Sequence, residues 1–124
     1  MKFAKYVFLI GGIYGLLALL PLYFMKDQIG VDHPPAITHA EFFYGFVGVA
    51  VAFQIVFLII SLDPVKYRLL MLASVVEKFS FAVPCTILFL KGLLAAPLFA
   101  ASMIDAVLGA LFIASFMMTR RTEA

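Results

Sequence analysis

Apolar residues dominate long stretches of the chain, and polar residues gather in the segments between them. The apolar stretches cover approximately residues 6–25, 39–62, 64–91 and 97–118. A helix needs roughly 20 consecutive apolar residues to cross the hydrocarbon layer of a bilayer, and each stretch reaches that length. The pattern therefore predicts an all-α fold, a polytopic four-helix membrane bundle that forms a single transmembrane domain over residues 1–124.

Local signals predict where several helices begin and end. The segment Thr38–Glu41 has the residue spacing of a capping box at the start of the second helix. Asp63 and Pro64 suit the N-cap and first position of the third helix, and Gly92 suits its C-terminal cap. The connections on either side of the third helix are short, which predicts antiparallel neighbours.

The positions of lysine and arginine predict the orientation, because cytoplasmic segments of membrane proteins are enriched in these residues. On one side of the membrane, the loop 26–40 and the turn between the third and fourth helices carry only Lys26 and Lys91. The two termini and the turn between the second and third helices carry more lysine and arginine residues. Both termini are therefore expected to be cytoplasmic and the loop 26–40 external. This larger set is Lys2, Lys5, Lys66, Arg68, Arg120 and Arg121.

Composition supports the membrane interpretation and excludes other classes. Hydrophobic residues make up 65% of the chain and charged residues 13%, whereas soluble domains are about a quarter charged. A soluble globular enzyme, a disordered chain and a disulfide-stapled module are excluded, the last because Cys85 is the single cysteine. A net charge of +2 predicts no nucleic-acid partner. The expected partners are the lipid bilayer and either further copies or a larger membrane protein, and no cofactor motif is present.

The predicted fourth helix carries small residues at every fourth position. Small residues allow helix backbones to approach closely in lipid, which favours a compact bundle. Such a face could instead pack against another chain. The repeating positions are Ser102, Ala106, Ala110 and Ala114.

Ionisable residues lie deep in the predicted third and fourth helices. Glu77, Lys78 and Asp105 fall near the same central layer, because the two helices start on opposite membrane faces. Ionisable groups at this depth normally face the bundle interior or a water-filled cavity. The accompanying polar residues are Gln54 at similar depth, and Ser74 and Ser80 on either side of Glu77.

The charges of this group do not balance. Lys78 can neutralise one carboxylate, and an unpaired carboxylate in low dielectric usually takes up a proton. We therefore expect Lys78 to pair with one of Glu77 and Asp105 and the other carboxyl to be protonated. A purely structural role remains open, in which Lys78 fixes the register of facing helices without chemistry.

A second polar group falls at the predicted outer surface, in and after the loop 26–40. Asp32, His33, His39 and Glu41 include residue types that bind divalent metals, but their spacing is not specific. No metal site is predicted, and His33, His39 and Glu41 are weak candidates only. A solvated loop before a capped helix is one alternative, and a ligand entrance formed by His39, Glu41 and Tyr44 is the other.

Three segments carry a resemblance to a known group of proteins. They are PPAITHAEFFYGF at 34–46, DPVKYR at 63–68 and EKFSF at 77–81. They resemble a small uncharacterised bacterial family of four-helix integral membrane proteins with no known activity. The resemblance implies the four-helix fold and, with the charge bias, a multi-pass protein of the bacterial inner membrane. It implies no chemistry.

Three functions are compatible with these residues. The favoured one is binding or transport of a small or lipidic solute through the buried Glu77, Lys78 and Asp105 centre. The alternative is a non-catalytic accessory subunit that packs against a larger membrane complex. An intramembrane acid–base enzyme is the least favoured, because no nucleophile or cofactor motif accompanies the carboxyls.

Overall fold

The computed structural model describes residues 2–123, with side chains as far as Thr119. Helix α1 (Lys2–Leu19) continues as the 3-10 helix η1 (Leu20–Phe24), and a short helix α2 (Lys26–Asp32) follows. The remaining helices are α3 (Ala40–Leu62), α4 (Leu70–Leu90) and α5 (Ala96–Glu123). Across residues 2–123 the fold contains no strand, so the predicted all-α class is confirmed.

Four helical segments are long and apolar enough to cross a membrane: Lys2–Phe24, Ala40–Leu62, Leu70–Leu90 and Ala96–Thr119. In the most apolar window of each segment, at most 33% of the residues are buried inside the protein. Most of the apolar side chains therefore lie on the outer surface, which is typical of helices that face lipid.

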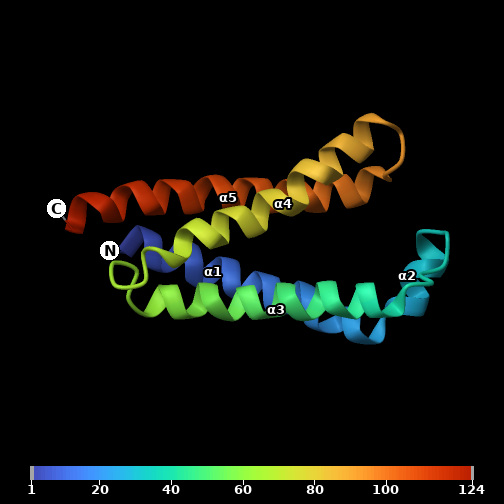
Figure 1. Ribbon diagram of the computed structural model, residues 1–124, viewed down its shortest axis with the longest axis horizontal. Helices are drawn as coiled ribbons and strands as arrows, with labels where there is room; N and C mark the ends of the chain where they lie inside the picture. The colour runs from blue at the N-terminus through green and yellow to red at the C-terminus, as the bar shows by residue number, and fades with distance from the viewer. Residues whose placement is uncertain (1, 124) are drawn as a thin grey trace.

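The long helices form two antiparallel pairs. α1 packs mainly against α3, and α4 packs mainly against α5, with smaller contacts between α1 and α5 and between α3 and α4. Figure 1 shows both described ends of the chain beside the turn from α3 to α4, whereas α2 and the α4–α5 turn lie at the opposite end. The covalent link between the pairs is the segment 63–69.

The hydrophobic core lies in the half of the bundle that contains the chain ends. Three phenylalanine rings from different helices fill its centre, and each is fully buried. Phe8 stacks on Phe112 with ring centroids 4.1 Å apart, and Phe57 meets Phe112 edge-on at 4.9 Å. We call this end the closed half. Ala4, Ile60 and Met71 complete its buried cluster.

The start of α4 corrects the expectation that the third long helix begins at Pro64. Residues 64–69 form turns, and α4 begins at Leu70. The Asp63 carboxylate does accept a bond of 3.2 Å from the Lys66 N–H, as an N-cap would. The next backbone bonds mostly join residues three apart, as between Leu70 N–H and the Tyr67 carbonyl, so the chain turns more tightly than an α-helix.

The predicted capping box at the start of α3 is also wrong. His39 is the N-cap residue, and it makes no side-chain capping bond. Glu41 instead lies 3.4 Å from the His39 ring nitrogen Nδ1, with both side chains exposed. At the far end of α4 the prediction holds. Gly92 has φ of +73°, and the bonds from Gly92 to Phe89 and from Leu93 to Leu88 form a Schellman cap.

The small-residue face of α5 is only partly internal. Ser102 is buried and Ala106 and Ala114 are half-buried, but Ala110 is exposed. Four residues turn a helix through about 400°, so a row at this spacing drifts by about 40° at each step. The buried row instead follows Ser102, Gly109, Phe112, Ser115 and Thr119.

Candidate functional site

A cavity of about 680 Å³ lies between the two helix pairs. Its lining comes from the C-terminal half of α1, the middle of α4, the first half and middle of α3, the N-terminal half of α5, and η1. The cavity runs from the middle of the bundle toward the end opposite the chain ends, and we call this part of the bundle the open half. The volume is within the range of small-molecule sites, roughly 300–1,000 Å³.

The cavity walls are apolar and combine small residues with aromatic rings. Phe46 of α3 and Phe81 of α4 stack across the gap between the pairs, with ring centroids 6.1 Å apart. Tyr14 of α1 adds a third ring to the lining. The space between these rings is left by small lining residues: Ala18, Gly45, Ala50 and Ala101.

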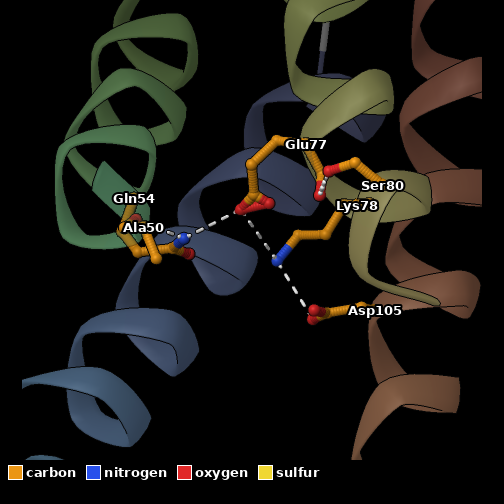
Figure 2. A network of polar contacts seen from close by, with 6 residues as sticks. All are labelled: Ala50, Gln54, Glu77, Lys78, Ser80 and Asp105. Carbon is orange, nitrogen blue, oxygen red and sulfur yellow. Dashed lines mark hydrogen bonds and ion pairs between the residues drawn. The ribbon is translucent and has the colours of Figure 1, made fainter. Parts of the chain in front are cut away.

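A chain of polar contacts at the edge of the cavity joins three helices (Figure 2). Lys78 Nζ donates to Asp105 Oδ1 of α5 at 3.1 Å and lies 3.8 Å from Glu77 Oε1. Gln54 Nε2 of α3 donates to the same Glu77 oxygen at 3.3 Å. Glu77 therefore points toward α3 and Lys78 toward α5, as neighbours about 100° apart on one helix must.

Burial differs among the charged groups. The Lys78 side chain is 3% exposed, whereas those of Glu77 and Asp105 are 15% and 21% exposed. The ammonium also lies 5.1 Å from the centre of the Phe57 ring, at the edge of the closed half. Because all three residues line the cavity, a molecule inside it meets carboxyl oxygens more readily than the ammonium.

Gln54 is the α3 member of this polar network, and its side chain is almost fully buried. Its amide nitrogen donates to the Ala50 carbonyl one turn earlier at 2.8 Å, as well as to Glu77. Its Oε1 atom is buried without a hydrogen-bond partner among the described residues. Gly15 of α1 makes room for this side chain, since a Cβ there would overlap the Gln54 carboxamide.

The path of α4 explains why the open half has space. Figure 1 shows α4 moving away from α3 along its length and toward α5. Pro84 lies inside α4, where its missing N–H and its ring disturb the helical ladder. Beyond it, Phe89 stacks on Phe99 of α5 at 4.2 Å, so the last turns of α4 pack within their own pair.

The structure brings together five of the residues singled out from the sequence. The cavity lining includes Gln54, Glu77, Lys78, Ser80 and Asp105. Ser74 lies outside it, fully buried and bonded to the Leu70 carbonyl at 2.8 Å. The proposed entrance residues also lie outside the lining. Of these, His39 and Glu41 are exposed, and Tyr44 stacks on Tyr23 at 6.1 Å.

The second polar group, around the segment 26–41, brings no three metal-binding side chains together in the described part of the chain. No cluster of three or more His, Cys, Asp or Glu side chains there could hold a metal ion. His33 follows the end of α2, while His39 pairs with Glu41. Nearby, the hydrogen bond of 2.9 Å between Lys26 and Asp27 raises the pKa of the lysine and lowers that of the aspartate.

The aromatic and small lining residues were not predicted from the sequence. Tyr14, Phe46 and Phe81 are ordinary residues of apolar helices, and nothing in their spacing distinguishes them from lipid-facing rings. Glycines in membrane helices commonly mark close helix contacts, but Gly45 has no atom within 4 Å of the position of a Cβ. Only knowledge of which helices pair would have placed these residues in a cavity.

No family model, curated protein or solved structure matches the chain. The site must therefore be interpreted from its own geometry. The resemblance to a small bacterial membrane family stays a prediction.

Proposed function

We propose that this protein binds a small amphipathic solute in the cavity between its helix pairs, as a step in storage, presentation or transport. The observation that carries the proposal is the position of the Gln54–Glu77–Lys78–Asp105 network at the edge of an otherwise apolar cavity of about 680 Å³. Such a cavity suits a molecule with an apolar body and a polar or charged head. The contacts of the network alone would not require the open volume beside it.

The proposal includes a location. The positively charged residues Lys2, Lys5, Lys66 and Arg68 belong to the closed half. By the positive-inside rule, the closed half and both termini face the cytoplasm and the cavity lies toward the external side of a bacterial inner membrane. Arg68 does more than anchor this end, because its guanidinium is buried and donates to the Phe116 carbonyl of α5 at 3.1 Å.

A matched pair of variants tests the function. Ala101 of α5 lines the cavity, whereas its exposed neighbour Ala100 does not. Native mass spectrometry of protein gently extracted from its host membrane is expected to show a recurrent small molecule on the natural chain. Ala101→Phe should lose that molecule by filling the cavity, and Ala100→Phe should keep it.

The accessory-subunit alternative rests on the exposed Ala110, which leaves part of the small-residue face of α5 free for another helix. In the same experiment this alternative predicts a different protein bound in fixed stoichiometry, with no recurrent small molecule. Equal retention of a small molecule by Ala101→Phe and Ala100→Phe would place the ligand outside the cavity and contradict the proposal.

A further inference from the structure

The charge and exposure of the network indicate which solutes the cavity accepts. The network contains two carboxyl groups, Glu77 and Asp105, and one ammonium, Lys78. Two ionised carboxylates and one ammonium leave a net charge of −1. No other charged side chain offsets this charge within the cavity, because the remaining residues that line it are uncharged.

The Lys78 ammonium already has partners within the protein. Lys78 is 3% exposed, bonds to Asp105 at 3.1 Å and lies against the Phe57 ring, so an anionic ligand would have to displace these contacts to reach it. Glu77 has only a 3.3 Å bond from Gln54 and a more distant approach of 3.8 Å to Lys78. The group that remains for an incoming charge is thus the Glu77 carboxylate.

The walls favour the same ligand. Tyr14, Phe46 and Phe81 present aromatic rings in the space beside Glu77. The negative faces of aromatic rings attract cations, and this attraction is larger when water is excluded. An apolar body packs against these rings while its positive charge lies near the carboxylate.

We infer that the cavity binds an amphipathic organic cation, such as a hydrophobic amine or quaternary ammonium compound, with Glu77 as its counter-ion. This inference rests on the proposed function and specifies its ligand class. Without a bound cation, the Glu77 carboxyl shares Lys78 with Asp105 and holds a proton, which keeps the buried layer neutral. When the cation binds, the proton leaves the Glu77 carboxyl for water and the cation takes its place, so the charge of the layer is unchanged.

Other titratable groups line the cavity beside Glu77, and their charges bear on the exchange of its proton for a cation. Lys78 is its neighbour on α4, Asp105 comes from α5 and Tyr14 from α1, while α3 contributes the uncharged Gln54. Lys78 and Asp105 neutralise each other, and the Tyr14 phenol is neutral near pH 7. Affinity for a permanent cation is therefore expected to rise with pH. The rise should stop at the pH where Glu77 is already ionised in the protein without ligand.

The test uses two ions of similar shape and opposite charge, tetraphenylphosphonium and tetraphenylborate, with triphenylphosphine oxide as a neutral probe. Binding to the full chain is measured by isothermal titration calorimetry in a neutral detergent, after subtraction of the heat of partition into empty micelles. The phosphonium ion is expected to bind saturably and at least about ten-fold more tightly than the borate, because opposite charges attract strongly at low dielectric. In a weakly buffered solution at neutral pH, binding should release about one proton per cation.

Variants then separate the charge effect from folding. Glu77→Gln should weaken phosphonium binding by at least about ten-fold and leave the neutral probe unchanged. Asp27→Asn removes the same charge from an exposed side chain outside the cavity and should change neither. The comparison of the two ions needs no variant, so it stands even if Glu77→Gln does not assemble.

The outcomes distinguish the two proposals. Borate or neutral probe binding as tightly as the phosphonium ion, or a Glu77→Gln protein with undiminished phosphonium affinity, would overturn the inference and leave a binding cavity of another specificity. Absence of saturable binding by all three probes would count against both the ligand class and the proposed function.

Discussion

The closed and open halves of the bundle are built by the same four long helices but fill their centres differently. In the closed half, Phe8, Phe57 and Phe112 occupy the space where the helices meet. In the open half, the helices present small residues to the same axis: Gly15, Ala18, Gly45, Ala50 and Ala101. Small residues usually draw membrane helices together. Here several of them leave a volume, because the pairs are held apart by the course of α4.

The polar network lies at the boundary between these halves. Lys78 contacts the closed half through Phe57, at 5.1 Å from its ring centre, and the cavity through its two carboxyl partners. A buried charge that loses its partner is far more costly than a missing apolar contact. The largest effects of substitution are therefore expected at this layer, and smaller ones on either side.

Replacing Lys78 by methionine should have the largest effect on stability. The change leaves Asp105 and Glu77 without a cation, and breaking a buried ion pair costs about 3–5 kcal/mol. Thermal unfolding in detergent, followed by circular dichroism, would measure the loss. The double variant Lys78→Met/Asp105→Leu removes both partners and should recover most of it. Equal stability of Lys78→Met and the natural chain would show that the Lys78–Asp105 ion pair does not hold α4 against α5.

Truncating Phe112 tests the closed half. Phe112→Ala should lower the free energy of unfolding by about 2–3 kcal/mol, since the cavity penalty remains although transfer from water contributes little in a membrane. Phe24 is the matched control, because it is 91% exposed and its truncation leaves no internal cavity. The same thermal measurement should separate the two variants clearly. Similar losses in both would mean that the aromatic cluster is not a packed core.

Two glycines in the open half should respond in opposite directions. Gly15→Ala places a methyl group against the Gln54 carboxamide and should destabilise by about 1–2 kcal/mol. Gly45→Ala meets no atom within 4 Å and should stabilise by about 0.5–1 kcal/mol through helix propensity. Thermal unfolding of both proteins checks the signs. Adding Gln54→Ala to Gly15→Ala should relieve the overlap, and failure to do so would place the strain elsewhere.

The sequence predicts the helices well because each must satisfy its backbone bonds alone and remain apolar over some 20 residues. It also predicts that Glu77, Lys78 and Asp105 meet, since charges at this depth are too costly to leave scattered. It does not predict α2, whose residues 26–32 mix charged and apolar types. Nor does it show that the turn before α4 extends to Leu69, because a turn and a first helical turn favour the same Asp-Pro pair.

The cavity itself was beyond prediction for a different reason. Its existence depends on which helices pair and how far each pair diverges, and these are properties of tertiary packing. Ala110 illustrates the limit. Its place in a regular four-residue row favoured a helix contact, within this chain or against another, and the slow rotation of that row around the helix leaves it exposed.

The single covalent link between the helix pairs has a mechanical consequence. Segment 63–69 joins the α1–α3 pair to the α4–α5 pair at one end only, so the opposite ends of the two pairs have no covalent link. A helix of about 20 residues is roughly 30 Å long, so a rotation of about 5° at the Phe8–Phe112 contact moves the far tips by roughly 2–3 Å. A shift of a fraction of an ångström near this pivot would thus become a larger displacement at the far tips, so packing in the closed half influences the distance between the helix pairs around the cavity.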